Sequence, residues 1–383
     1  MKEPFDMNLV QRGARLRRSP YYQATQRHGP WGFTVYNHTL FPIGYDDLEV
    51  EYQALVEGVT VWDVAVERNV EITGRDAFAL ANRLTPRDLA KCRVGQAKYV
   101  VITSEDGGII NDPVLLRLGE NHFWLALADS DVLLWARGVA LGSGLDVRIV
   151  EPDVSPLQIQ GPKAKNVVQT LFGNRVLELP YYHFLETELD GIPVIVTRTG
   201  WSAEVGYEIY LRDGSKGVAL WERVMEAGRP HGIRPTGPSD IRRIEAGILN
   251  WGADITLEDT PYHVGLERLV DVEKTADYAG KEALARIRAE GVSRKLVGIE
   301  IGGDRIDMNA APWPVLHDGR AVGRVTSAIY TPRLRRNIGY AMVPIERAAL
   351  GTRLDVSIPE IGEREATVVE RPFVDPGKEI PKA

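Results

Sequence analysis

The sequence predicts an α+β protein that ends in a small β-barrel. Helical and strand-like stretches alternate over roughly residues 30–285, and short strands at near-regular spacing follow after about residue 290. A chain of 383 residues is also too long for one ordinary core, which predicts two or three domains. We expect an N-terminal arm over 1–30, an α+β region over 31–285 and a barrel domain over 286–383.

Periodicity and end signals predict the helices. Asp129 or Ser130 is expected to cap the helix that begins near residue 130, and Ser239 the helix that ends near Gly247. The expected helices cover 46–58, 76–84, 130–142, 162–172, 217–228 and 239–248.

Alternating apolar residues between turn signals predict the strands. A hairpin is expected to join 99–103 to 109–118 across Gly107-Gly108. Further strands of the α+β region are expected at 59–65, 70–72, 121–128, 146–151, 155–160, 185–189, 194–197 and 206–211. Those of the barrel are expected at 295–301, 314–316, 320–327, 336–342 and 353–358.

Composition narrows the class of protein. The net charge of -7 does not indicate a nucleic-acid partner, and the single cysteine excludes an intramolecular disulfide framework. Residues 1–18 contain no apolar signal region, and no window approaches the 18 or so apolar residues of a membrane span. We therefore expect a cytoplasmic enzyme without a membrane partner.

Asp112 is a carboxylate inside an apolar run, between Ile109-Ile110 and Val114-Leu115-Leu116. Such an acid is costly to bury unless it is paired. It is either a turn acid bonded to nearby backbone N–H groups or a catalytic or ligand-binding acid.

Two further segments have candidate binding residues. In a strand after Gly206, Glu208 and Tyr210 face one side, which suits a planar heterocycle with N–H donors, or else a solvated acid beside a surface tyrosine. Arg243 on a helix could hold a ligand carboxylate or pair with Glu245 or another nearby acid. The seven histidines lack metal-ligand spacing, so no metal is expected.

Taken together, several segments in order resemble the glycine cleavage T-protein (aminomethyltransferase) superfamily. Within it the chain is most similar to the dimethylsulfoniopropionate demethylases, through Thr34-Val35-Tyr36-Asn37-His38, Val61-Trp62-Asp63-Val64 and Asn111-Asp112-Pro113-Val114. The superfamily segments are Gly107-Gly108-Ile109-Ile110-Asn111-Asp112, Ile159-Gln160-Gly161-Pro162, Arg198-Thr199-Gly200-Trp201, Gly206-Tyr207-Glu208, Arg243-Ile244-Glu245-Ala246-Gly247, Tyr278-Ala279-Gly280-Lys281 and Val322-Gly323-Arg324-Val325-Thr326-Ser327.

The resemblance implies a ring of three domains around a folate channel, with the α+β region divided into 31–155 with 240–285, and 156–239. It implies that tetrahydrofolate is the methyl acceptor and that a small molecule is the methyl donor. A homodimer is compatible with the resemblance but is not required by it. Asp112 matches the catalytic acid near folate N5. The implied cofactor contacts are Tyr99, Asp112, Glu208 and Arg243, and the implied substrate pocket is Tyr36, Trp201 and Tyr210.

The expected reaction moves a methyl group from an onium compound, with dimethylsulfoniopropionate the leading candidate, to N5, giving 5-methyltetrahydrofolate and methylmercaptopropionate. Aromatic faces attract such a cation. Ala203 and Glu204 stand where the demethylases have a basic residue and a glutamine, so a betaine or aryl methyl ether is the alternative donor. Glu204 is expected to repel a substrate carboxylate.

Three other classes share the fold. The first is a T-protein-like aminomethyltransferase, whose Gly-Tyr-Thr-Gly-Glu-Asp-Gly pattern is here Gly200-Trp201-Ser202-Ala203-Glu204-Val205-Gly206. The second is a non-catalytic folate-binding protein of iron–sulfur assembly, whose cysteine motif is absent from 274–281. The third is the folate half of a flavin-dependent demethylase, whose dinucleotide-binding half has no counterpart in residues 1–30.

Overall fold

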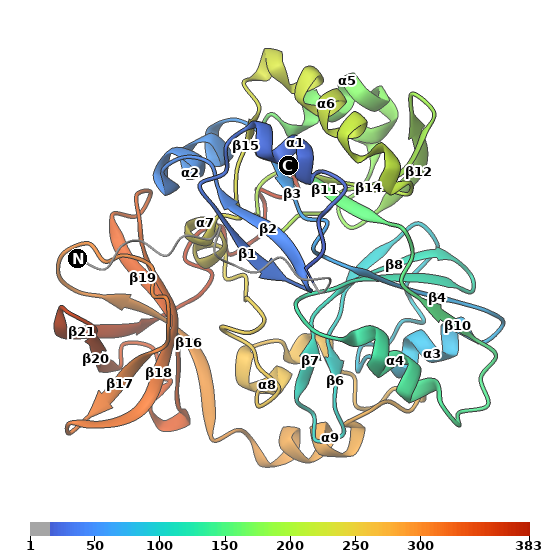
Figure 1. Cartoon of the computed structure of the whole chain (residues 1–383). Coiled ribbons are helices and arrows are strands. Elements are labelled where there is room, and N and C mark those ends of the chain that lie inside the picture. Colours follow the sequence, from blue (N-terminus) through green and yellow to red (C-terminus); the bar gives the residue numbers. More distant parts are fainter. Residues whose placement is uncertain (1–15) are drawn as a thin grey trace.

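The computed structural model describes residues 16–383, so the expectation for residues 1–15 of the arm lies outside the described part. Figure 1 shows three bodies: the barrel, a sheet covered by α5 and α6, and a second sheet beside α3 and α4. The predicted α+β class with a terminal barrel is confirmed. The predicted domain boundaries stay a prediction.

The first sheet has six strands in the order β12-β13-β14-β11-β3-β15. Tyr207 and Ile209 of β14 point into an apolar core beneath the helices, while Tyr210 belongs to a cluster on the opposite face. The strands are β12 (Phe184–Leu189), β13 (Ile192–Thr197), β14 (Gly206–Leu211), β11 (Ser155–Gln160), β3 (Thr60–Asp63) and β15 (Arg234–Pro235).

The second sheet has five strands in the order β10-β4-β9-β8-β5. One cluster packs it against α3 and α4, and another, which includes Leu116 and Trp124, joins it to Ile195 and Tyr210 of the first sheet. Its strands are β10 (Arg148–Val150), β4 (Asn69–Thr73), β9 (His122–Ala126), β8 (Val114–Gly119) and β5 (Ala97–Tyr99).

The barrel is closed in the order β16-β19-β18-β17-β20-β21, which leaves it without an open edge. The sequence analysis missed β21. The strands are β16 (Arg294–Ile301), β17 (Trp313–His317), β18 (Arg320–Thr331), β19 (Arg336–Pro344), β20 (Arg353–Ile358) and β21 (Gly362–Val369). Two separate hairpins are β1 (Gly32–Tyr36) with β2 (Thr39–Gly44), and β6 (Ile102–Thr103) with β7 (Ile109–Asn111).

The helices follow the predicted order, with two differences. The side chain of Ser239 accepts a hydrogen bond from the amide of Arg242, as predicted for an N-cap. The predicted cap at Asp129 or Ser130 is wrong, because α4 begins after Asp131, and Asp129 instead accepts from the amide of Asn37, 92 residues away. The predicted helices also omitted α8 and α9, and the region of α1 was predicted only as part of the N-terminal arm. The helices are α1 (Tyr22–Arg27), α2 (Leu48–Glu57), α3 (Ala77–Arg83), α4 (Val132–Ala140), α5 (Ala164–Phe172), α6 (Gly217–Gly228), α7 (Asp240–Glu245), α8 (Pro261–Val264) and α9 (Lys281–Glu290).

Candidate active site

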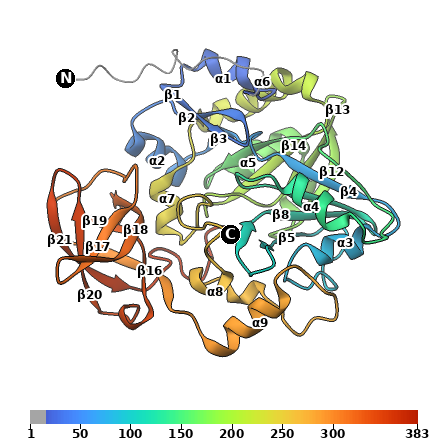
Figure 2. The ribbon, with the colours of Figure 1, turned by 60° about the horizontal axis from the view of Figure 1, so that its bottom comes forward.

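A cavity of about 930 Å³ is lined by both sheets, the β1–β2 hairpin, the loop after α7 and the chain after the barrel. Figure 2 shows the C-terminal end between the barrel and the sheets. This last segment contributes Asp375, Lys378 and Pro381 to the wall. It is held in place where Arg198 Nη2 donates to the Ala383 backbone oxygen at 2.8 Å.

Asp112 lies in the wall of this cavity, in the two-residue link between β7 and β8. Antiparallel pairing sets Tyr99 opposite Val114, and the Tyr99 hydroxyl donates to Asp112 Oδ2 at 2.8 Å. Burial raises the pKa of Asp112 from 3.8 to about 7, although the Tyr99 hydrogen bond acts in the opposite direction. The acid can therefore be charged or neutral near pH 7, which suits a proton acceptor.

The Gly107-Gly108 turn that precedes Asp112 needs glycine because the backbone of another loop packs closely against Gly108. A Cβ atom on Gly108 would lie 2.0 Å from the carbonyl oxygen of Leu257, so a side chain at this position would displace the loop after α7.

Glu208 lies at the centre of the first sheet and also lines the cavity. Its carboxylate accepts hydrogen bonds from Thr199 Oγ1 at 2.7 Å, Tyr210 Oη at 2.9 Å and Gln158 Nε2 at 2.7 Å. Burial raises the pKa of Glu208, and these donors favour its charged form. The predicted shared face of Glu208 and Tyr210 is confirmed by their contact.

The aromatic positions divide into two groups. Tyr36 and Trp201 line the cavity and pack in one cluster with Phe41 and Trp62. Tyr210 is fully buried outside the lining, where its hydroxyl holds Glu208. The structure therefore brings two of the three predicted substrate residues to one wall of the cavity, and places the third behind Glu208.

Arg243 lies outside the cavity lining and is fully buried. Its guanidinium contacts Asp240 at 2.6 Å, Asp254 at 2.8 Å and Ser327 Oγ at 2.9 Å. The predicted pairing with a nearby acid is therefore confirmed, but the partners are Asp240 and Asp254 and not Glu245. The cationic side chains that do line the cavity were missed by the sequence analysis, and they are Arg87, Lys98, Arg268 and Lys378.

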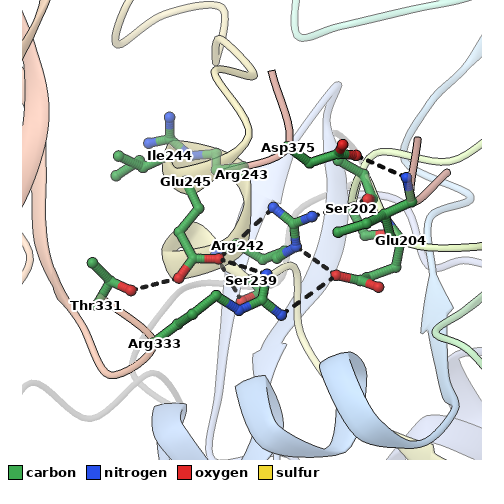
Figure 3. Close-up of polar contacts among 12 residues, drawn as sticks. Ser202, Glu204, Ser239, Arg242, Arg243, Ile244, Glu245, Thr331, Arg333 and Asp375 are labelled. Atoms are coloured by element: carbon green, nitrogen blue, oxygen red, sulfur yellow. Dashed lines mark hydrogen bonds and ion pairs between the residues drawn. The ribbon is translucent and has the colours of Figure 1, made fainter. Parts of the chain in front are cut away.

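Glu204 also lies outside the lining, in an ion-pair network shown in Figure 3. Arg242 Nε contacts it at 2.6 Å, and Arg333 of the barrel lies 3.9 Å away. Both arginines also lie 3.7 Å from Glu245, which accepts from the hydroxyls of Thr331 and Tyr52. The expected repulsion of a substrate carboxylate is therefore wrong as argued, because the Glu204 charge is neutralised by arginines.

Two kinds of feature are absent from the described residues. Between residues 16 and 383 no three His, Cys, Asp or Glu side chains are grouped as metal ligands. No helix in the same span is both long and apolar enough to cross a bilayer.

Comparison with known proteins identifies the family. The profile of the GCVT N-terminal domain matches residues 19–274, and that of the glycine cleavage T-protein C-terminal barrel domain matches 294–375. The chain belongs to the glycine cleavage T-protein family. It is an enzyme of this tetrahydrofolate-dependent, one-carbon-transferring class.

Individual relatives cover almost the whole chain. The dimethylsulfoniopropionate demethylase DmdA of Ruegeria pomeroyi is 40% identical over 93% of this chain and 97% of its own. An aminomethyltransferase of Bacillus mycoides is 32% identical over 94% and 98%. The crystal structure of the glycine cleavage system aminomethyltransferase T from Bartonella henselae, 24% identical, superposes with a TM-score of 0.83 over 94% of this chain and 98% of that one, which shows the shared fold.

The cavity residues fit a pterin ring. Pterins present N–H donors along one edge, and the wall offers the Glu208 carboxylate together with Gln158 Oε1, a buried oxygen that has no hydrogen-bond partner in the protein. An orphaned buried acceptor is costly unless a ligand satisfies it. The cationic lining residues are of the type that could pair with the carboxylates of a folate glutamate.

Proposed function

We propose that the protein is a demethylase that moves a methyl group from an onium compound to N5 of tetrahydrofolate, with dimethylsulfoniopropionate as the donor. The observation that carries the proposal is the likeness to DmdA over nearly the full length of both chains. The cavity supports it, because an aromatic wall and a titratable acid line the same space.

The aromatic wall suits the donor's positive centre. Tyr36, Phe41, Trp62 and Trp201 can surround an onium methyl group, and such cation–π contacts contribute roughly 2 kcal/mol when water is excluded. Arg87, Lys98, Arg268 and Lys378 provide cationic groups for the donor's carboxylate as well as for the folate tail. An aryl methyl ether has no positive centre for the aromatic faces to attract, although the carboxylate of an ether such as vanillate can still pair with the cations.

Asp112 is the proposed catalytic residue. The bound folate supplies N5 as the nucleophile, and transfer of the methyl group releases a neutral thioether and one proton from N5. The Asp112 carboxylate accepts that proton or stabilises the positive charge at N5. Tyr99 positions the carboxylate through its 2.8 Å hydrogen bond. The cavity walls hold the methyl donor and N5 in line for the transfer.

A donor panel tests the proposal. The protein is incubated with tetrahydrofolate and dimethylsulfoniopropionate, glycine betaine or vanillate, and 5-methyltetrahydrofolate is measured by mass spectrometry. We expect product with dimethylsulfoniopropionate, and none when folate is omitted. Turnover of vanillate alone would overturn the onium assignment.

Aminomethyl transfer is the second candidate, supported by the Bacillus mycoides relative. The panel therefore includes an aminomethylated lipoyl protein, with release of ammonia as the readout. Formation of 5,10-methylenetetrahydrofolate from that substrate, with no onium turnover, would favour this candidate over demethylation.

A further inference from the structure

Glu67 is a second carboxyl group beside Glu208, and the mechanism above does not use it. It lies in the turn between β3 and β4, two residues before β4 begins. The side chain is only partly buried, and it lines the cavity. A ligand in the cavity can therefore reach it.

One amide links the two acids. Gln158 Nε2 donates to Glu208 Oε1 at 2.7 Å and lies 3.5 Å from Glu67 Oε1. Two carboxyl groups that lie this close in a buried site do not both ionise readily, because each negative charge raises the pKa of the other acid. The charge therefore belongs to whichever acid has more hydrogen-bond donors.

The donors favour Glu208 as the charged member. It accepts from Thr199 and Tyr210 as well as from Gln158, with Thr197 Oγ1 at 3.4 Å. Glu67 has only the long Gln158 contact, and within residues 16–383 no Lys, Arg or His nitrogen lies within 4.0 Å of it. Burial and the Glu208 charge both raise the pKa of Glu67 well above 4.5.

The other neighbours of Glu67 do not supply a positive charge. Tyr36 of β1 and Tyr210 of β14 are the other titratable groups that its charge affects, and Asp112 and Asp129 also face Tyr36. The adjacent Arg68 is bound to Glu151, with its Nε donating at 2.9 Å. Glu67 thus has acids and phenols around it, which disfavour its charged form.

We propose that Glu67 is a neutral carboxylic acid that donates its O–H to an acceptor atom of the pterin ring, while Glu208 accepts from the ring's N–H groups. This inference rests on the proposed use of folate. A pterin has a carbonyl oxygen and ring nitrogens that accept hydrogen bonds beside its N–H donors. Two charged carboxylates would repel those acceptors. A charged acid matches the N–H donors of the ring, and a neutral acid matches its acceptors.

Two substitutions at Glu67 separate the roles. Glu67→Gln keeps an N–H donor in the same place, and Glu67→Met keeps the length of the side chain but removes the donor. Dissociation constants for tetrahydrofolate are measured by anaerobic calorimetry without a methyl donor. We expect Glu67→Gln to bind within about threefold of the wild type, and Glu67→Met to bind about tenfold or more weakly, the scale of one unpaired buried polar group.

A matched control and a second readout make the result independent of activity. Glu188→Gln is the same chemical change at an exposed position of β12 and is expected to leave binding unchanged. Infrared difference spectroscopy of the wild type should show the C=O band of a protonated carboxyl group at pH 8, and this band should be lost in Glu67→Gln.

Three outcomes would overturn the inference. The first is Glu67→Gln binding folate as weakly as Glu67→Met. The second is both variants binding like the wild type, which would leave the proposed function intact. The third is unchanged folate binding with a tenfold higher KM for the onium donor in Glu67→Gln, which would make Glu67 an anionic partner of the donor. Failure of the wild type to bind tetrahydrofolate would instead overturn the proposed function itself.

Discussion

Replacing Asp112 with asparagine should make the protein more stable at pH 8 and a much poorer catalyst. Asparagine has the same shape and can still accept the hydrogen bond from Tyr99. It cannot take a proton or carry a negative charge, so we expect methyl transfer to fall by about 10² or more. Folate binding should persist.

The gain in stability follows from the pKa of Asp112. This pKa is raised from 3.8 to about 7 in the folded protein, so the folded state binds the proton more tightly than the unfolded state. The stabilisation is complete below pH 3.8 and is lost as the pH rises through 7. The full loss is about 4 kcal/mol at 1.36 kcal/mol per pKa unit, and roughly 3 kcal/mol of it falls between pH 5 and pH 8.

Urea unfolding of both proteins at pH 5 and pH 8 measures this difference. Asp112→Asn removes the titrating group, so its free energy of unfolding relative to the wild type should rise by roughly 3 kcal/mol between the two pH values. A constant difference would refute the raised pKa. Full activity of the variant would remove Asp112 from the chemistry, and a variant that fails to fold would support the interpretation of Asp112 as a turn acid.

Four further predictions concern the same machinery. In the wild type, kcat/KM for the onium donor should fall about tenfold per pH unit below pH 7 as Asp112 is protonated, and a flat profile would contradict this. Tyr99→Phe removes the donor that lowers the Asp112 pKa, so the profile should move to higher pH, whereas an unchanged midpoint would show that the hydrogen bond is unimportant. Trp201→Ala should raise the KM for the donor by up to about 30-fold and leave the dissociation constant for folate unchanged. If both constants rose equally, Trp201 would contact the pterin instead. Arg242→Leu leaves Glu204 and Glu245 without their buried partner and should lower the free energy of unfolding by about 3–5 kcal/mol. The Arg333 side chain is partly exposed, so Arg333→Ala should lower it by at most about 1 kcal/mol, and similar losses in the two variants would refute this ranking.

Local patterns in the sequence predict much of the fold and part of the site. The alternation after Gly206 places Glu208 and Tyr210 on one face, since side chains alternate along any strand. Ser239 caps α7 as its position indicates, because an N-cap depends on residues two or three places away. Such features need only neighbouring residues, so the sequence is sufficient to find them.

Long-range partners explain what the sequence analysis missed. Arg243 matches a family position, but Asp254 and Ser327, 11 and 84 residues further on, occupy its guanidinium. Glu67 approaches Glu208 only through Gln158, 91 residues away. Its one sequence signal is an acid directly after Val64-Ala65-Val66, the same pattern of an acid in an apolar run that singled out Asp112.

The ion-pair network of Figure 3 crosses the boundary between the barrel and the α+β region, so it affects hybrid proteins that combine a barrel from one relative with the α+β region of another. Arg333 and Thr331 come from the barrel, whereas Glu204 and Glu245 come from the α+β region. A chimera joined near residue 290 keeps Arg242 beside both carboxylates, but both lose Arg333 and Glu245 also loses the Thr331 hydroxyl. We therefore expect such a hybrid to fold with a modest loss of stability, which a donor barrel with a hydroxyl and an arginine at these two positions would avoid.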